Sequence, residues 1–250
     1  MGNERDKNLQ DTTDQMVHGH EGWLEMTSNH GHKGEDFAAL FKWGCNMETD
    51  GLPQKEGLKA WAVFPTGEKK DVTLVKGSAD HYSLKITTPV DGFYQLVAMH
   101  TGNYVLNKNG EYDRGTYREH PDAARAVRYE QYAQVFVPVG HGIENAPPRL
   151  DTTLEIVVPN WKRWSAGEQI VLQVIFCGSP LANKAVDIMS KGPGGFQQWQ
   201  ETTDGGGEIR LNTSKPGYYM MAVRHRLQEG KEGIYDETSF VATLWFMVLN

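Results

Sequence analysis

The sequence predicts an all-β protein built from two tandem immunoglobulin-like β-sandwich domains. Short segments alternate between apolar and polar residues with a period of two, which is typical of half-buried strands. Turn-forming residues separate these segments, and the 250-residue chain contains 27 glycines and 11 prolines. A motif that recurs half a chain length apart is the third observation, because repeats of this size indicate two related units.

The predicted strands follow one another at regular intervals, each bounded by Gly, Pro, Asn or Asp. In the first half we expect strands over 58–64, 72–75, 81–86, 93–99 and 132–139. In the second half we expect them over 153–158, 169–177, 185–190, 208–211, 218–225 and 240–249. One segment favours a helix, because Pro121–Gln131 begins with proline and contains three alanines.

The internal repeat defines the domain organisation. Gly92–His100 and Gly217–His225 both start with glycine, an aromatic residue and tyrosine, and both end in histidine. A turn glycine that leads into an aromatic-rich strand is expected where a sandwich chain crosses between sheets. We therefore expect a leader over 1–17, an N-terminal sandwich with the metal-site candidates over 18–142, and a C-terminal sandwich over 143–250.

The composition excludes several classes of protein. The net charge of −7 and the lack of a Lys/Arg cluster argue against a nucleic-acid surface, which needs a basic face. The mild net negative charge instead favours the accumulation of cations at the protein surface. The longest apolar stretches have the length of strands, so we expect no direct insertion into a membrane. Residues 1–17 are mostly polar and lack the hydrophobic region of a signal peptide, so we expect a disordered or added leader.

No catalytic signature occurs in the sequence. There is no G-x-S-x-G, H-E-x-x-H or G-x-x-x-x-G-K-[ST] motif, and no G-x-G-x-x-G motif follows a strand. The Asp-Gly-Gly-Gly segment at 204–207 lacks the alternating acidic ligands of a calcium loop and is typical of a hairpin turn. We therefore expect that the protein is not an enzyme.

Four of the nine histidines fall in two short motifs, His18-Gly-His20 and His30-Gly-His32. Residues two apart point to the same side of an extended chain, so each motif offers two imidazoles to one ion. The central glycine lets a metal approach closely. Imidazole suits several late first-row metals, so the ligand type leaves the identity of the ion open. The alternative interpretation is a histidine-containing segment that holds no ion.

Three further residues are candidates for completing a metal site. Cys45 lies two residues before Met47, and both are soft donors that late first-row metals accept. His100 ends a predicted strand, and His141 lies between two glycines at a strand exit. Each also has a structural interpretation. In that interpretation Cys45 is a small buried hydrophobe before an Asp-Gly turn at 50–51, and the histidines hydrogen-bond to the backbone.

Tryptophan supports an alternative function of a different class. Trp161, Trp164 and Trp199 would form a carbohydrate-stacking face if they lay exposed in one plane. The alternative to the metal role is therefore an adhesion or carbohydrate-binding module of two sandwiches. Sandwich proteins commonly bury tryptophan between their sheets, however, so we expect these three side chains in the core.

Several motifs follow one another in an order and spacing that resembles a known family. They are His18-Gly-His20-Glu-Gly-Trp23-Leu24-Glu25, Phe41-Lys-Trp43-Gly44-x-Asn46-Met47-x-Thr-Asp50-Gly51, Gly92-Phe-Tyr94, Ala133–Gly140, Gly167-Glu, Gly178-x-Pro180-Leu181, Thr203-Asp204-Gly-x-Gly and Lys215-Pro216-Gly217. The family is an uncharacterised bacterial extracytoplasmic one, encoded beside energy-coupling-factor and other nickel/cobalt importers. The resemblance covers residues 18–250. Members carry histidine where this chain has Cys45, a change that favours softer metals or removes a ligand.

The resemblance implies a periplasmic accessory protein that binds or delivers Ni²⁺ or Co²⁺ to membrane importer components. His18 and His20 are the first ligands we expect, and Cys45, His100 and His141 are candidates to complete the site. Zn²⁺ and Cu²⁺ stay open as alternative ions, because imidazole and thiolate accept both. Ligation needs neutral imidazoles, so we expect metal affinity to fall below about pH 6.

Overall fold

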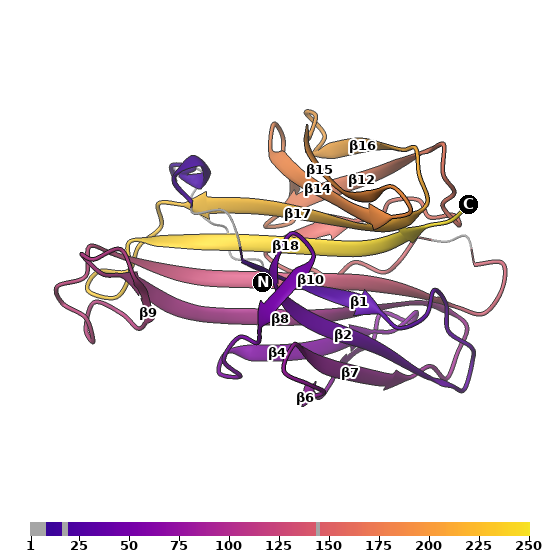
Figure 1. Cartoon of the computed structure of the whole chain (residues 1–250), viewed down its shortest axis with the longest axis horizontal. Helices are drawn as coiled ribbons and strands as arrows, with labels where there is room; N and C mark the ends of the chain where they lie inside the picture. Colours follow the sequence, from indigo (N-terminus) through magenta and orange to yellow (C-terminus); the bar gives the residue numbers. More distant parts are fainter. Residues whose placement is uncertain (1–8, 17–19, 144–145) are drawn as a thin grey trace.

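The protein forms a layered β-structure (Figure 1), described for residues 9–16, 20–143 and 146–250 in a computed structural model. Its strands form three sheets of nine, five and four strands, which confirms the all-β sandwich class. One turn of 3-10 helix, η1 (Thr13–Gln15), precedes the strands. Within these ranges no helix has the length and apolar character needed to cross a membrane.

The nine-stranded sheet forms the central layer. In spatial order its strands are β15 (Gly195–Thr202), β14 (Ala185–Gly192), β17 (Gly217–Leu227), β18 (Glu237–Val248), β10 (Arg125–Val139), β8 (Gly92–Leu106), β4 (Leu58–Val63) and β5 (Lys69–Asp71), and β9 (Tyr112–Arg114) pairs with β8. β10 and β18 pair in parallel at the centre, whereas their other neighbours pair antiparallel. The two halves of the chain therefore share one continuous sheet.

Two smaller sheets cover the central one. The five-stranded sheet contains β1 (Glu21–Met26), β2 (Asp36–Cys45), β7 (His81–Thr87) and β6 (Val75–Lys76), with β3 (Glu48–Gly51) paired to β2. The four-stranded sheet contains β11 (Leu154–Val157), β12 (Glu168–Phe176) and β13 (Ser179–Pro180), with β16 (Glu208–Thr213) paired to β12. In Figure 1 these two sheets lie on different sides of the long strands β8, β10, β18 and β17.

Side-chain alternation along the central strands builds two large cores. In β10, Val135 and Val137 join the core beneath the five-stranded sheet, whereas Phe136 joins the core of the four-stranded sheet. In β18, Trp245 belongs to the first core and Phe246 to the second. Successive residues of a strand face opposite sides, so the two cores lie on opposite faces of one sheet. Both halves of the chain thus contribute to each core.

The internal repeat of the sequence corresponds to β8 and β17, which occupy matching places in the two halves of the sheet. The Tyr94 hydroxyl donates to the Val90 carbonyl at 2.9 Å, and the Tyr219 hydroxyl donates to the Lys215 carbonyl at 2.7 Å. Both bonds reach back four residues from the start of the strand. This is the tyrosine corner known from immunoglobulin-like sandwiches.

The structure corrects one sequence-based prediction, that of a helix, and it adds detail to the predicted units and leader. The predicted helix over Pro121–Gln131 does not form, because the chain turns near residue 122 and β10 begins at Arg125. Partners on both sides of β10 outweigh the weak helix preference of its alanines. The units predicted over 18–142 and 143–250 share the central sheet. Residues 9–16 of the predicted leader pack on the sheet, where the buried Thr12 amide donates to the Arg226 carbonyl at 2.8 Å.

Candidate metal site

The hairpin between β2 and β3 holds two of the candidate donor groups. Its two central residues, Asn46 and Met47, have φ angles of 55° and 60°. Positive φ at both positions defines the type I′ turn, whose twist matches that of the paired strands. Cys45 and Glu48 pair directly beside this turn. The hairpin therefore reverses at 46–47 and not at the Asp-Gly pair expected from the sequence.

A β-bulge in the same hairpin directs Asp50. Trp43 pairs with Gly51 and Gly44 pairs with Thr49, so Asp50 is the extra residue of β3. A bulge of this kind re-aims a side chain. The bulge also requires glycine at position 44, because a Cβ there would overlap the carbonyl oxygen of Glu48. Gly44 and the turn together position Cys45 and Asp50.

His20 reaches this hairpin from the neighbouring strand. β1 pairs with β2 in a register that sets Glu21 opposite Gly44, so His20 lies next to Cys45. The Nε2 atom of His20 is 2.6 Å from a carboxylate oxygen of Asp50. One donor atom each from His20, Cys45 and Asp50 lies within 4.8 Å of the other two. Nitrogen, sulfur and oxygen donors therefore converge at one exposed point.

This spacing suits a metal ion after small side-chain movements. Tetrahedral ligands at about 2.0–2.3 Å from an ion lie roughly 3.3–3.8 Å apart. The ion would replace the proton that now joins His20 to Asp50. Three protein ligands leave at least one coordination position open. His18, the first-choice ligand from the sequence, lies outside the described residues.

Carboxylates surround the thiol. Burial, Glu21 and Asp50 raise the pKa of Cys45, so the protonated thiol is favoured when no cation is present. Glu21 is itself buried, and its carboxylate pairs with Arg224 at 2.6 Å. Burial raises the pKa of Glu21 to about 7, although Arg224 opposes this shift. Ionised Asp50 and Glu21 repel a thiolate at Cys45, but the same negative charges attract a divalent cation.

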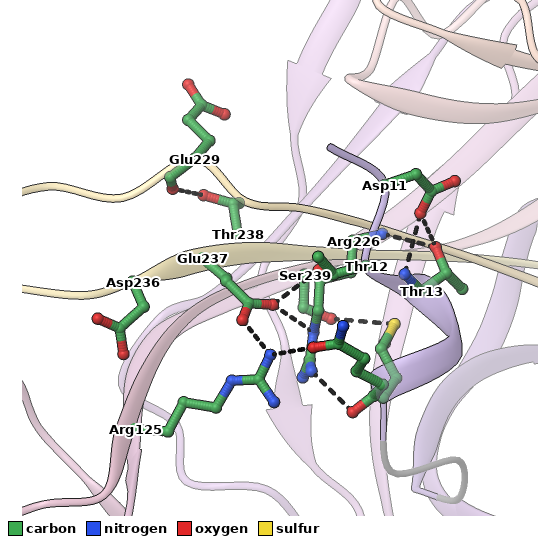
Figure 2. Close-up of polar contacts among 12 residues, drawn as sticks. Asp11, Thr12, Thr13, Arg125, Arg226, Glu229, Asp236, Glu237, Thr238 and Ser239 are labelled. Carbon is green, nitrogen blue, oxygen red and sulfur yellow. Dashed lines mark hydrogen bonds and ion pairs between the residues drawn. The ribbon is translucent and has the colours of Figure 1, made fainter. Parts of the chain in front are cut away.

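A cavity of about 410 Å³ adjoins the candidate site. Aromatic side chains make up most of its wall, and its lining residues are Met16, His20, Trp43, Tyr104, Tyr112, Val127, Tyr129, Arg226 and Ser239. Met16 also lines this cavity, and Figure 2 shows the polar contacts that hold residues 11–16 on the sheet. The Thr12 hydroxyl donates to Glu237 at 2.8 Å, Arg125 pairs with the same carboxylate, and the Ser239 hydroxyl contacts the Met16 sulfur at 3.8 Å.

His100 lies behind this site, in an aromatic environment. Its ring is 2% exposed and packs edge-on against Trp43, with 5.1 Å between centroids. The ring of His20 stacks on that of Trp43, with 6.4 Å between the ring centroids. Burial and the nearby Arg114 lower the pKa of His100 to about 4. The structure therefore does not group His100 with the donors of His20, Cys45 and Asp50.

His141 lies at the other end of β1. It neighbours His30 and His32, with ring centroids 6.4 and 6.0 Å away. Burial and the charges of His32 and Arg163 lower the pKa of His30, so its imidazole is neutral near pH 7. The four described candidates are thus not brought to one point: His20 and Cys45 meet, whereas His100 and His141 lie elsewhere.

Other residues also clarify the predictions. The sequence does not mark Asp50 as a donor, because its Asp-Gly pair is typical of a turn; only the bulge brings Asp50 close to His20. Met47 is 7% exposed and belongs to the core beneath the five-stranded sheet.

Trp164 is buried in the other core, and the half-buried Trp161 and Trp199 pack against it. The carbohydrate-binding alternative requires these three rings to be exposed. No disulfide joins Cys45 and Cys177.

Three solved structures are similar to this chain at low sequence identity. A Legionella pneumophila protein of the DUF4785 family is 13% identical with a TM-score of 0.30, covering 82% of this chain and 52% of its own. An Escherichia coli alpha-2-macroglobulin activated by porcine elastase is 10% identical with a TM-score of 0.31, covering 92% of this chain and 20% of its own. A segment of two fibronectin type-III domains from chicken tenascin is 9% identical with a TM-score of 0.25. The match covers 90% of this chain and 98% of the tenascin segment.

The chain thus spans about half of the Legionella structure and a fifth of the Escherichia coli one. No curated protein matches it. A family model does match, over residues 17–227, and its description is "Domain of unknown function (DUF4198)". This match covers most of the chain and includes His20, Cys45 and Asp50. The protein therefore belongs to the DUF4198 family.

Proposed function

We propose that this protein binds a divalent transition-metal ion, Ni²⁺ or Co²⁺ in the first place, through His20, Cys45 and Asp50. The observation that carries the proposal is the convergence of three different donor atoms within 4.8 Å. His18 is the fourth ligand that we propose, because an H-x-H motif presents both imidazoles to the same side. Zn²⁺ and Cu²⁺ compete for such a donor set.

The donor chemistry supports a transition metal over Ca²⁺ or Mg²⁺. Calcium and magnesium bind through oxygen ligands, whereas imidazole and thiolate select late first-row ions. Asp50 adds one negative charge, and an ionised Cys45 adds a second. Two anionic ligands and one or two imidazoles neutralise a divalent ion. Loss of the Cys45 thiol proton then accompanies binding.

Exposure of the donors supports a role in metal delivery. The side chains of His20 and Asp50 are 60% and 43% exposed. Structural zinc sites, by contrast, enclose the ion with four protein ligands. An open site allows an ion to enter and to be passed on. The resemblance to a family encoded beside nickel and cobalt importers supports an extracytoplasmic accessory role, with importer components as partners.

Calorimetric titration of the metal-stripped full chain with Ni²⁺, Co²⁺, Zn²⁺ and Cu²⁺ tests the proposal. Loss of a ligand from a small donor set weakens binding by at least the 10- to 100-fold known for outer-shell changes. We therefore expect Cys45→Ser and His20→Ala to lose about 100-fold or more in Ni²⁺ affinity. The matched variants Cys177→Ser and His81→Ala remove the same groups elsewhere, and both should bind as the wild type does.

Two outcomes would contradict the proposal. One is Ni²⁺ and Co²⁺ binding that is equally weak in the wild type and in Cys45→Ser. The other is undiminished binding at pH 5, since imidazoles that ligate a metal must be neutral and protonation should compete below about pH 6.

A further inference from the structure

Three histidine rings meet at the end of β1 that is remote from Cys45. His30 and His32 follow β1, and His141 follows β10, more than a hundred residues later. The ring centroids of His30 and His32 are 4.7 Å apart. His141 lies 6.4 Å from the first ring and 6.0 Å from the second. These rings form what we call the histidine trio.

Backbone hydrogen bonds fix the two segments to each other. The Gly31 amide donates to the Pro138 carbonyl at 2.9 Å, and the Gly140 amide donates to the Gly31 carbonyl at 3.1 Å. Gly31 thereby forms a parallel bridge with Val139. Gly31 is buried in this bridge, so His30 and His32 both project from its other side. The trio therefore rests on a backbone that is already organised.

The separation of His30 and His32 matches that of two imidazoles around one ion, whereas His141 lies farther from both rings. An imidazole nitrogen binds at about 2.0–2.1 Å, which sets the ring centroids of tetrahedral ligands roughly 5 Å apart. The pair His30–His32 meets this value within a few tenths of an ångström. His141 must move by about an ångström relative to both. Its exposed position between Gly140 and Gly142 allows this movement.

A hydrogen bond orients the first ring for ligation. Nδ1 of His30 lies 2.6 Å from the side-chain oxygen of Asn29. Because that oxygen only accepts, Nδ1 carries the proton and Nε2 is left as the donor for a metal. Metal-bound histidines commonly donate their other N–H to such an oxygen, which fixes the tautomer and the ring direction.

A cavity of about 370 Å³ adjoins the trio. His30 and His141 line it together with Asn29, Trp161, Lys162 and Arg163. Lys162 is paired with Glu168 at 2.6 Å. An ion held by three neutral imidazoles keeps its full charge and at least one open coordination position. The cavity provides room there for water or a small anion.

We propose that His30, His32 and His141 form a second metal site, which binds a divalent transition ion through three imidazole nitrogens. The site is separate from the one at Cys45, because the two lie at opposite ends of β1. Its three ligands are all imidazoles, which suit several late first-row ions, Zn²⁺ and Cu²⁺ among them. The proposal stands or falls independently of the function proposed for His20, Cys45 and Asp50.

Zn²⁺ titration of the full chain in a background that lacks the other site tests this inference. The background is His20→Ala/Cys45→Ser, and the test variants add either His30→Ala/His32→Ala or His141→Ala. We expect the background to bind one equivalent of Zn²⁺, and each test variant to bind it about tenfold more weakly or worse. His81→Ala in the same background is the matched control, and it should leave binding unchanged.

Co²⁺ absorption in the same proteins identifies the ligands. Cobalt at the trio should give visible d–d bands without a thiolate charge-transfer band, and His30→Ala/His32→Ala should abolish them. The inference is overturned if the background binds no Zn²⁺, or if both test variants bind it as tightly as the background does. The wild type tests separately whether Cys45 binds the metal. A thiolate charge-transfer band that Cys45→Ser removes belongs to the site of His20, Cys45 and Asp50.

Discussion

The two smaller sheets carry matching hairpins, and only one of these hairpins bears the proposed donor groups. β2 and β3 join through Asn46 and Met47, with φ angles of 55° and 60°. β12 and β13 join through Cys177 and Gly178, with φ angles of 49° and 80°. Both connections are two-residue turns of the same hand. The hairpin itself is therefore part of the shared scaffold.

An aromatic–histidine contact lies beneath each hairpin. Trp43 packs edge-on against His100 at 5.1 Å, and Phe176 packs against His225 at 4.5 Å. His100 and His225 occupy equivalent positions in the sequence repeat, and both are buried. A histidine that recurs at this position in both halves is explained by packing. This comparison favours the structural interpretation of His100 over the metal-ligand one.

The difference between the hairpins lies at their tips. Cys45 precedes the turn in the N-terminal half, whereas Phe176 precedes it in the other half and packs into the core there. Asp50 comes from a bulge in β3, while β13 contains only Ser179 and Pro180. The proposed metal site therefore depends on a few residues added to a repeated framework, which is how one fold serves many activities.

The largest expected effect comes from Gly44→Ala. A Cβ at Gly44 would overlap the Glu48 carbonyl, so the bulge must rearrange and Cys45 and Asp50 must separate. We expect a loss of about 3 kcal/mol or more in the free energy of unfolding, together with loss of Ni²⁺ binding. Urea unfolding and calorimetric titration measure the two effects.

Gly178→Ala provides the control in the matching hairpin. A Cβ there meets nothing within 4 Å, and only the positive φ of 80° opposes it. We expect a cost of about 1–2 kcal/mol and unchanged Ni²⁺ binding. If Gly44→Ala retained full metal affinity, the bulge would not be what positions the donors.

The next largest effect is the pH dependence of the free energy of unfolding, to which Glu21 contributes. The pKa of Glu21 is raised to about 7 by burial, from an ordinary value of 4.5. Between these values the folded protein holds a proton that the unfolded chain releases. The contribution of Glu21 to stability is therefore complete below pH 4.5 and is lost as the pH rises through 7. The whole change is on the order of 3 kcal/mol.

Glu21→Gln removes this titration. Urea unfolding at pH 5 and pH 7.5 should show a wild type that loses more stability over this interval than the variant does. The comparison uses only the difference between the two pH values, so any general destabilisation by glutamine cancels. Parallel changes in both proteins would mean that Glu21 keeps an ordinary pKa beside Arg224.

A smaller effect compares the tyrosine corners directly. Tyr94→Phe and Tyr219→Phe each remove a hydrogen bond to a carbonyl four residues upstream, and each should cost about 1 kcal/mol. Tyr94 also accepts a bond from the Val90 amide at 3.1 Å, so its loss should be slightly larger. Thermal or urea unfolding measures both. A variant without any loss would show that the two corners are not energetically equivalent.

The strands show how far the sequence carries the fold. The predicted segments 81–86 and 169–177 nearly coincide with β7 and β12, because alternation marks their half-buried faces. By contrast, β10 begins at Arg125, inside the segment predicted as a helix. Its long pairing with β8 and β18 is non-local, so no local preference reveals it. Tertiary pairing explains this error.

The candidate sites show a similar limit. The H-x-H motifs and Cys45 are visible in the sequence, because the chemistry of their side chains is distinctive. The involvement of Asp50 depends on positive φ at Met47, which is uncommon for a residue with a side chain. The proximity of His141 to His30 depends on a backbone bridge between Gly31 and Val139. Neither relation follows from local sequence.

The smallest effect expected is that of Arg163→Gln. Arg163 lines the cavity beside the histidine trio, and its charge opposes a cation there. Because the side chain is exposed, solvent screens most of this repulsion. We expect Zn²⁺ affinity to rise by no more than a few-fold at low salt, measured in the His20→Ala/Cys45→Ser background. An unchanged or lower affinity would show that Arg163 does not act on the ion electrostatically.

X-ray absorption spectroscopy of the full chain loaded with one equivalent of Ni²⁺ tests the central claim most directly. If His20, Cys45 and Asp50 hold the ion, the spectrum contains one sulfur neighbour besides nitrogen and oxygen, and Cys45→Ser removes it. The same sulfur neighbour persists in Cys177→Ser. A shell of nitrogen and oxygen alone in the wild type would contradict the claim that Cys45 and its hairpin form the principal metal site.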